Sequence, residues 1–358
     1  MTSTIENSDT AGKSYVISID AMGGDRGPAA VVAGCSRSAK ANPDIAFIFH
    51  GPEDELNKLL KRKRSLRGRA EVRNATGIVN MNDKPSQVMR NGKGTSMWSA
   101  IEAVKSGDAD VCVSCGNTGA LMALSMLQLR KLPGINRPAI AVLWPSRNQA
   151  GVNVMLDVGA DVRADEHDLL QYALMGASYI RNGFDVQKPR IGLLNVGTED
   201  NKGRQELKAA HELMNVNAEV SNYQYVGFVE GNDIPSDRVD VIVTDGFTGN
   251  IALKSAEGTA KLIRELLKEA FRHTVLSRLA TILALPSLRR LSKRIDPRQV
   301  NGGVFLGLNG TVVKSHGSAD ATSVSAAVKL AFQLAHSEFN EKLAARVASA
   351  TALEQTND

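Results

Sequence analysis

Four polar, glycine-rich loops, each placed directly after a short apolar run of β-type residues, constrain the fold of this chain most. The loops read DAMGGDRGP, SCGNTGAL, NVGTEDNKG and TDGFTGNIALK, at Asp20–Pro28, Ser114–Leu121, Asn195–Gly203 and Thr244–Lys254. The runs before them are Tyr15–Ile19, Asp110–Val113, Ile191–Leu194 and Val239–Val243. Open α/β sheets bind ligands outside the carboxyl ends of their strands, so we expect these loops to converge on one site. A site rich in backbone N–H groups suits phosphate or another oxyanion.

The order of the expected elements predicts an α/β protein with a mostly parallel sheet. Beyond the four loops, β-type runs at Ile45–Phe49 and Tyr223–Val229 alternate with helical stretches such as Ala29–Lys40 and Asp165–Asn182. Strands that alternate with helices of about 10–15 residues are typical of βαβ units. One exception is the pair Ala139–Trp144 and Gly151–Asp157, which are separated by a short polar turn and are expected to be adjacent strands.

The expected domain organisation is a single large unit. Residues 1–13 are predicted to be disordered, residues 14–340 to form the α/β unit, and residues 341–358 to form a C-terminal tail. Residues 259–298 interrupt the α/β pattern, because they are helical in composition and combine leucine and isoleucine with many arginines and lysines. We expect them to be an inserted amphipathic helical segment.

Composition narrows the classes of function. Aromatic residues make up only 4% of the 358 residues, which argues against a stacking platform for single-stranded nucleic acid, and no nucleic-acid recognition motif is present. The net charge of +5 favours acidic partners, such as a phosphorylated substrate, an acidic protein or an anionic membrane.

Three cysteines without a framework of spacings fit a reducing cytosol, and no signal peptide or transmembrane run is expected. The motifs GxGxxG, GxxxxGK[ST], HExxH and GxSxG are missing, so no cofactor and no metal site is predicted.

The polar loops carry side chains suited to binding an anion or moving a proton, although each has a structural alternative. The loop at Asp20 can be only a strand-to-helix turn, Asn117 can be only a helix cap, and Lys202 can belong to an exposed surface ion pair. A lone histidine such as His316 is more often structural than catalytic. The joint occurrence favours a site, whose candidate residues are Asp20, Gly23, Gly24, Asn117, Thr118, Gly119, Glu199, Lys202, Asp245, Thr248, Gly249, Asn250, Lys314 and His316.

Two basic segments stand apart from these loops. Lys58–Arg73 is a dense basic run that predicts either a solvated surface or a dock for an acidic protein or a membrane. Leu276–Ile295 mixes leucines with arginines and lysines, and Pro286 is expected to divide it into two short helices. Such a basic amphipathic segment suits an interfacial membrane anchor, an oligomer interface or a satellite core.

Taken in order, the motifs resemble the bacterial phosphate acyltransferase family PlsX over about Tyr15 to Leu334. The residues that carry the resemblance are IDAMGGD at Ile19–Asp25, GNTGAL at Gly116–Leu121, GLLNVGTE at Gly192–Glu199, Lys202–Gly203, GFVEG at Gly227–Gly231, DGFTGN at Asp245–Asn250 and KSHGS at Lys314–Ser318. Two positions depart from the family pattern: Leu156–Asp161 ends in Asp where Asn is more frequent, and Cys115 stands where a small residue is common.

The resemblance implies an activity and a setting. The expected reaction is transfer of a fatty acyl group from acyl-[acyl carrier protein] to inorganic phosphate, which gives acyl phosphate for phospholipid synthesis. The expected fold is a three-layer α/β/α unit related to phosphotransacetylases and isocitrate dehydrogenase-like enzymes. The expected setting is a cytoplasmic homodimer, peripherally attached to the inner face of the cell membrane, with a downstream glycerol-3-phosphate acyltransferase as a further partner.

The chemistry of the residues agrees with this reaction. Phosphate is itself a competent nucleophile once it is desolvated and aimed, so no serine or cysteine nucleophile is needed. The predicted catalytic residues are Lys202, Asn250, Asp245 and His316; Lys202 would neutralise phosphate, and Asp245, His316 or Asp20 would manage its proton. Asn117, Thr118, Thr248 and Asn250 would hold phosphate and the thioester oxygen. The alternatives are a phosphotransacetylase acting on a short acyl-CoA and a non-enzymatic membrane scaffold.

Overall fold

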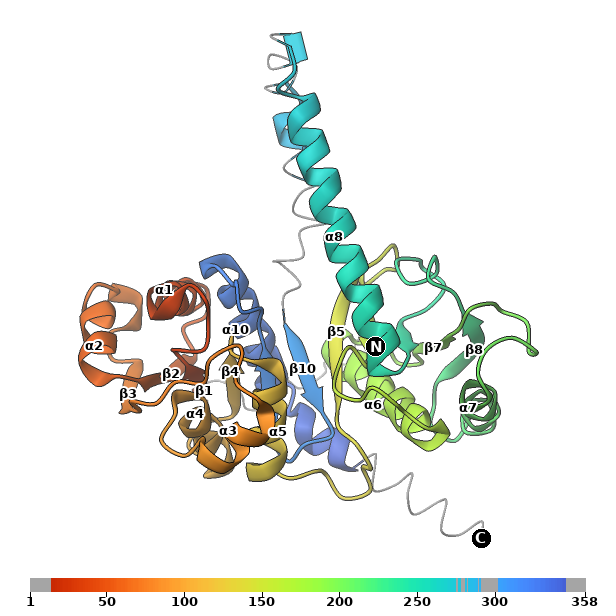
Figure 1. Cartoon of the computed structure of the whole chain (residues 1–358), viewed down its shortest axis with the longest axis horizontal. Helices are drawn as coiled ribbons and strands as arrows, with labels where there is room; N and C mark the ends of the chain where they lie inside the picture. Colours follow the sequence, from red (N-terminus) through yellow and green to blue (C-terminus); the bar gives the residue numbers. More distant parts are fainter. Residues whose placement is uncertain are drawn as a thin grey trace, which may run out of the picture.

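A computed structural model of the chain describes residues 14–274, 276–277, 281, 283–288, 290 and 302–345. Within these residues one 11-stranded sheet has the order β3-β2-β1-β4-β11-β10-β5-β6-β9-β7-β8 (Figure 1). The strands are β1 Tyr15–Asp20, β2 Ile45–Gly51, β3 Ala70–Asn74, β4 Val111–Ser114, β5 Ala139–Pro145, β6 Val152–Leu156, β7 Arg190–Leu194, β8 Gln224–Val229, β9 Val241–Val243, β10 Gly303–Leu306 and β11 Thr311–Lys314. The described α-helices are α1 Gly27–Ala41, α2 Glu53–Lys61, α3 Pro85–Asn91, α4 Ser96–Lys105, α5 Thr118–Gln128, α6 Glu166–Phe184, α7 Gln205–Val216, α8 Gly246–Ala270 and α10 Ala321–His336.

Helices cover both faces of this sheet, because successive side chains of each strand point to opposite sides. In β4, Val111 and Val113 pack into the core that contains Val31 of α1 and Val324 of α10. Cys112, between them, packs into a second core with residues of α4 and α5. The prediction of a three-layer α/β/α fold is confirmed.

The sheet is mostly parallel, but its two halves run in opposite directions. Strands β10 and β5 are antiparallel to each other, β10 is antiparallel to β11, and β5 is antiparallel to β6. The remaining pairings are parallel on both sides of this junction. As a result, β1, β4 and β11 end at one edge of the sheet, whereas β6, β7 and β9 end at the opposite edge. The loops therefore leave the sheet at two opposite edges, although residues after β4, β9 and β11 line one cavity.

Most of the expected elements are present, and the differences lie in the basic segments. The two strands expected at residues 139–157 are β5 and β6, which pair as predicted. The basic run Lys58–Arg73 begins in the last turn of α2, continues through the connection, and enters β3, a strand that the pattern missed. Its Arg69 is a structural residue that donates to the carbonyl oxygens of Ala39, Asn42, Pro43 and Ser65.

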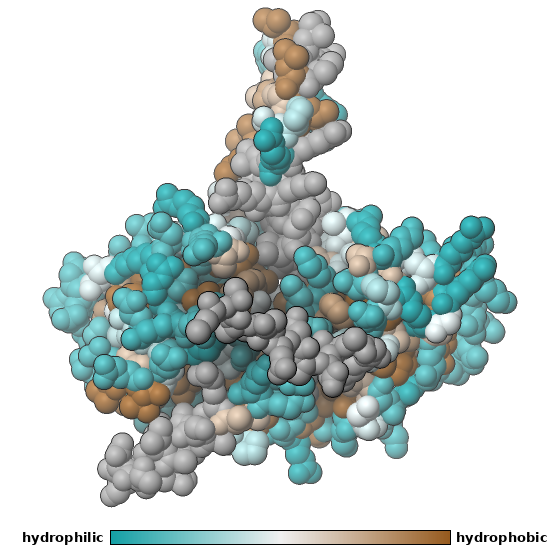
Figure 2. Space-filling view, turned by 180° about the vertical axis from the view of Figure 1, so that it is seen from behind, coloured by the Kyte–Doolittle hydropathy of each residue, from teal (hydrophilic) through white to brown (hydrophobic). Residues whose placement is uncertain are grey.

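Helix α8 begins at Gly246 rather than near residue 259, and it projects from the body of the molecule (Figure 1). Its apolar residues Leu262, Ile263, Leu266 and Leu267 are exposed, and hydrophobic residues are visible on the projecting part in Figure 2. Residues 283–288, which lie beyond α8, are helical. Pro286 lies within this helical stretch instead of ending it. The rest of the predicted amphipathic segment lies largely outside the described residues. None of the described helices combines the length and the apolar character that crossing a membrane requires.

Candidate active site

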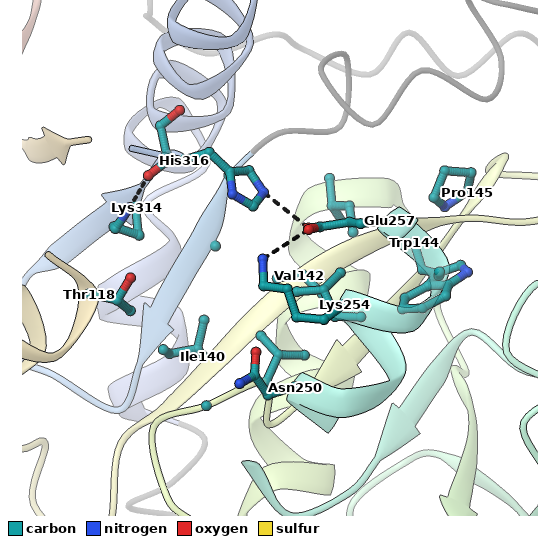
Figure 3. A pocket seen from close by; sticks show the side chains of 18 of the residues that line it. Thr118, Ile140, Val142, Trp144, Pro145, Asn250, Lys254, Glu257, Lys314 and His316 are labelled. Atoms are coloured by element: carbon teal, nitrogen blue, oxygen red, sulfur yellow. Dashed lines mark hydrogen bonds and ion pairs between the residues drawn. The ribbon is translucent and has the colours of Figure 1, made fainter. Parts of the chain in front are cut away.

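A cavity of about 410 Å³ lies where the two halves of the sheet meet. Its wall includes four residues predicted from the loops: Thr118 at the start of α5, Asn250 in the first turn of α8, Lys314 at the end of β11, and His316 two residues later (Figure 3). The lining also includes apolar residues from strand β5, the loop after β6 and α8: Ile140, Val142, Leu143, Trp144, Val158 and Leu253. The cavity therefore combines polar and cationic groups with an apolar surface.

One carboxylate contacts a lysine and a histidine in this cavity. Lys254 Nζ lies 2.9 Å from Oε2 of Glu257, and His316 Nε2 lies 3.2 Å from Oε1 of the same residue (Figure 3). Burial raises the pKa of Glu257, but the contacts from His316 and Lys254 outweigh it and lower that pKa to about 2. Glu257 is consequently ionised at neutral pH. It was not predicted, although the i,i+3 spacing of Lys254 and Glu257 on one helix was a signal for the pair.

Lys314 is a buried cation at the same site, with only 8% of its surface exposed. Burial and the neighbouring Lys254 lower its pKa to about 8, against the opposing influence of Asp20 and Cys115. Its Nζ donates to the carbonyl oxygen of Ser315. An ammonium group that is buried with one carbonyl acceptor retains donor capacity for an anionic ligand.

The glycines at the start of α8 allow the helix to begin against the loop that follows β6. A Cβ at Gly249 would lie 1.9 Å from the carbonyl oxygen of Asp157, and a Cβ at Gly246 would lie 2.6 Å from Asp157 Oδ2. Asp245 caps the helix, since its Oδ1 accepts from the backbone N–H of Thr248 at 2.7 Å, and Arg204 pairs with its other oxygen. This packing fixes Asn250 at the cavity wall. The catalytic role predicted for Asp245 and the substrate-binding roles predicted for Thr248 and Gly249 stay predictions.

Asp157 is a buried residue that the loop analysis missed, although it lies in the LDVGAD motif. Its carboxylate accepts from the backbone N–H groups of Ile140 at 2.8 Å, Ala160 at 2.9 Å and Asp161 at 2.7 Å. Burial raises its pKa to about 6 in spite of these donors. Asp157 thus ties β5 to the loop on which α8 begins.

The polar side-chain atoms of Asp20 and Asn117 form hydrogen bonds within the protein. Asp20 is buried and accepts from Ser96 Oγ at 2.7 Å and Ser114 Oγ at 2.6 Å; burial raises its pKa. Asn117 caps α5 by accepting from Ala120 N at 3.0 Å, and its Nδ2 donates at 2.9 Å to the carbonyl oxygens of two residues of the preceding loop, Met81 and Asp83. These contacts favour a structural role for both residues.

The predicted glycines of the first two loops allow close approach between segments. A Cβ at Gly23 would lie 2.5 Å from Asp20 Oδ2, one at Gly24 would lie 3.2 Å from Cβ of Cys115, and one at Gly119 would lie 2.9 Å from Cγ of Pro85. The loops after β1 and β4 are therefore packed against their neighbours. Whether these glycines also admit a ligand stays a prediction.

Lys202 and Glu199 lie in the loop after β7, at the opposite edge of the sheet from β11. Both are exposed, and the backbone N–H of Lys202 donates to the carbonyl oxygen of Glu199 at 3.0 Å. Neither residue lines the described cavity. The same loop reaches the site indirectly, because Arg204 contacts Asp245 at the start of α8. The roles proposed for Lys202 and Glu199 stay predictions.

The three cysteines are unsuited to act as nucleophiles. All are buried, and burial raises the pKa of Cys35 and Cys112 well above the usual range and that of Cys115 to about 11. A thiol that keeps its proton at neutral pH is a poor nucleophile.

The fold is one that phosphotransacetylases share. Similar solved structures include EutD phosphotransacetylase from Staphylococcus aureus, with a TM-score of 0.57 and 15% identity over 92% of this chain and 95% of that chain. A phosphotransacetylase from Streptococcus pyogenes has a TM-score of 0.60 and 17% identity over 91% and 95%. The dehydrogenase branch of the fold is represented by 4-hydroxythreonine-4-phosphate dehydrogenase from Klebsiella pneumoniae, with a TM-score of 0.51 and 11% identity over 90% and 99%. At such identities the likeness shows the fold alone.

Comparison with related sequences identifies the family to which this chain belongs. The model of the family described as "Fatty acid synthesis protein" matches residues 15–342. The chain is 69% identical to the phosphate acyltransferase of Ruegeria sp. (strain TM1040) over 355 residues, which cover 99% of this chain and 95% of the relative. It is 68% identical to that of Paracoccus denitrificans (strain Pd 1222) over 349 residues, or 98% and 94%. The chain belongs to this family, and it is an enzyme of acyl transfer to phosphate.

Proposed function

We propose that the enzyme takes its fatty acyl group from acyl-[acyl carrier protein] and releases acyl phosphate for phospholipid synthesis. The observation that supports this most directly is the cavity, whose lining combines buried Lys314 with the apolar residues Ile140, Val142 and Trp144. The cation suits phosphate, and the apolar wall suits the hydrocarbon next to the thioester.

Direct attack by phosphate on the thioester carbon fits the residues around the cavity. Lys314 and Lys254 supply positive charge, and Asn250 and Thr118 supply neutral donors that can hold the developing oxyanion. Thr118 also begins α5, where unpaired backbone N–H groups favour an anion. We therefore expect no acyl-enzyme intermediate. Detection of an acyl group on any cysteine or serine during turnover would overturn this mechanism.

A long acyl chain is favoured over a short one by a second apolar cavity of about 820 Å³. It shares Trp144, Ala256 and Ala260 with the first cavity and continues along α8 to Phe271. This continuity does not favour a phosphotransacetylase limited to short acyl-CoA, and membership of an enzyme family does not favour a non-enzymatic scaffold.

The homodimer and the peripheral membrane contact are assigned to the projecting region. Exposed apolar residues of α8 suit a contact with a second copy, and the basic amphipathic stretch after it suits an anionic bilayer surface. We place the enzyme in the cytoplasm at the inner face of the membrane, where a glycerol-3-phosphate acyltransferase would consume the product. Flotation with anionic liposomes tests this: replacing Ile282, which lies outside the described residues, and Leu285 by Glu should release the protein but keep its activity. Normal binding by that variant would assign the segment to the dimer.

The decisive test of the reaction is incubation of the protein with acyl-[acyl carrier protein] and inorganic phosphate. Mass spectrometry should detect free carrier and acyl phosphate in equal amounts, and omission of phosphate should abolish both. A parallel reaction with acetyl-CoA separates the alternative. Faster turnover of acetyl-CoA than of the acyl carrier would contradict the proposal.

A further inference from the structure

We propose that Glu257 is a positioning residue that orients His316 for proton transfer from phosphate to the departing thiolate. This inference rests on the proposed function, since it assigns a proton route within that reaction. Glu257 belongs to α8 and His316 to the loop after β11, so the pair spans the junction between the two halves of the sheet (Figure 3).

Each carboxylate oxygen of Glu257 contacts one side chain of the cavity. Its Oε1 faces His316 Nε2 at 3.2 Å and its Oε2 faces Lys254 Nζ at 2.9 Å. Because an ionised carboxylate only accepts, the nitrogen that faces it must carry a proton. Neutral His316 is thereby held as the Nε2–H tautomer, which leaves Nδ1 with a lone pair. Nδ1 has no hydrogen-bond partner among the described residues, and His316 lines the cavity.

The arrangement follows the logic of a carboxylate–imidazole pair, in which the carboxylate fixes the tautomer and stabilises the imidazolium that forms. The lowered pKa of Glu257 supports this role, since a carboxyl group that stays ionised cannot itself deliver a proton. Lys254 contributes by holding the second oxygen and so limiting rotation of the carboxylate.

The step balances without any further reactant. A phosphate oxygen forms a C–O bond with the thioester carbon, the C–S bond breaks, and its electron pair goes to sulfur. The proton that phosphate brought passes to Nδ1 of His316 and from there to sulfur. Acyl phosphate and the free thiol leave, and His316 returns to its neutral form.

Glu257→Gln tests the inference sharply because Lys254 should dictate how the new amide is oriented. The amide oxygen should face the Lys254 ammonium, so the NH₂ group should face His316 Nε2. A donor at that position moves the imidazole proton to Nδ1 and removes the base. We expect kcat to fall by about 10²-fold or more, the usual contribution of a general base, while the KM for phosphate changes less than threefold. Glu265→Gln, an exposed change farther along α8, is the matched control and should stay within twofold of the wild type.

A second measurement reads the tautomer without turnover. Long-range ¹H–¹⁵N spectra of the full-length protein, with the His316 signals identified by their loss in His316→Asn, should show the Nε2–H form in the wild type and the Nδ1–H form in Glu257→Gln. Unchanged kcat in Glu257→Gln, or the same tautomer in both proteins, would overturn the inference. If the wild type released no acyl phosphate, the proposed function would fail, whereas the spectra would still decide whether Glu257 orients His316.

Discussion

Replacing Lys314 by Met should make the fold more stable while it damages the enzyme. Lys314 is buried at the end of β11, and burial is the main cause that lowers its pKa from 10.5 to about 8. A lowered pKa means that the folded state disfavours the charged form. Methionine has a similar length and flexibility without the charge, so it should occupy the same space.

The size of the effect follows from the pKa change. A difference between 10.5 and about 8, at about 1.4 kcal/mol per pKa unit, corresponds to roughly 3 kcal/mol of unfavourable free energy for protonated Lys314 in the folded protein. Only a small fraction of the side chain is exposed, so solvent screening does not reduce this figure much. At pH 7 we therefore expect the free energy of unfolding of Lys314→Met to exceed that of the wild type by up to about 3 kcal/mol.

The sign of the pH dependence provides an internal check. Below about pH 8 Lys314 is protonated in both the folded and the unfolded protein, so its cost is present in full. Between about pH 8 and pH 10.5 the unfolded chain binds more protons than the folded one, and the stability of the wild type rises with pH relative to the variant. The advantage of Lys314→Met should therefore shrink over this range and vanish above it.

Urea unfolding at pH 7 and pH 10, at one protein concentration, measures both effects. Added inorganic phosphate should narrow the gap at pH 7, because a ligand held by Lys314 stabilises only the wild type, by about 2.7 kcal/mol at 100 times its dissociation constant. Equal stability of the two proteins at pH 7 would refute the burial argument. Equal stabilisation of both by phosphate would remove Lys314 from the phosphate site.

Three further changes test the site and its support. Asn250→Ala should lose about 10²-fold or more in rate, the usual effect of removing one oxyanion donor, with an unchanged thermal unfolding midpoint; a near-normal rate would exclude the residue. Lys202→Ala should show a similar loss, and near-normal activity would remove Lys202 from the site. Gly249→Ala should lower the unfolding midpoint measured by calorimetry by several degrees. The reason is that its Cβ would lie 1.9 Å from the carbonyl oxygen of Asp157, so α8 would have to shift. An unchanged midpoint would show that the loop containing Asp157 can move aside without a loss of stability.

Local patterns were enough to predict an α/β protein with a mostly parallel sheet, whereas the three-layer arrangement was expected from the family resemblance. Apolar runs followed by glycine-rich turns predicted strands, and the short polar turn between β5 and β6 predicted two adjacent strands, which pair in the structure. Strand β3 escaped because it lies in a basic run, Lys58–Arg73, where charged residues dominate the period-two pattern. A short edge strand with partly exposed side chains contains few apolar residues, so its alternating pattern is hard to detect in the sequence.

The order of strands in space was beyond these patterns, and it decides which loops meet. Strand β10 lies between β11 and β5, and its antiparallel pairing with β5 joins residues more than 150 positions apart, which no local period encodes. It sends the loop with Lys202 to the opposite edge of the sheet from Lys314. For the same reason the contact between Glu257 and His316 could not be read from a helix pattern and a strand end considered separately.

The reversed halves also explain why α8 carries so much of the site. The helix begins at the far edge, packed on Asp157, and rises about 1.5 Å per residue. Asn250 therefore faces the lower part of the cavity beside Gly159, whereas Glu257, seven residues and two turns later, reaches the level of His316 on the same face. A single rigid helix thus sets the spacing between a candidate oxyanion donor and the candidate proton-transfer pair. Any change that moves the start of α8 must shift both groups together. A substitution at Gly249 should therefore lower the rate of acyl transfer by moving Asn250 and Glu257.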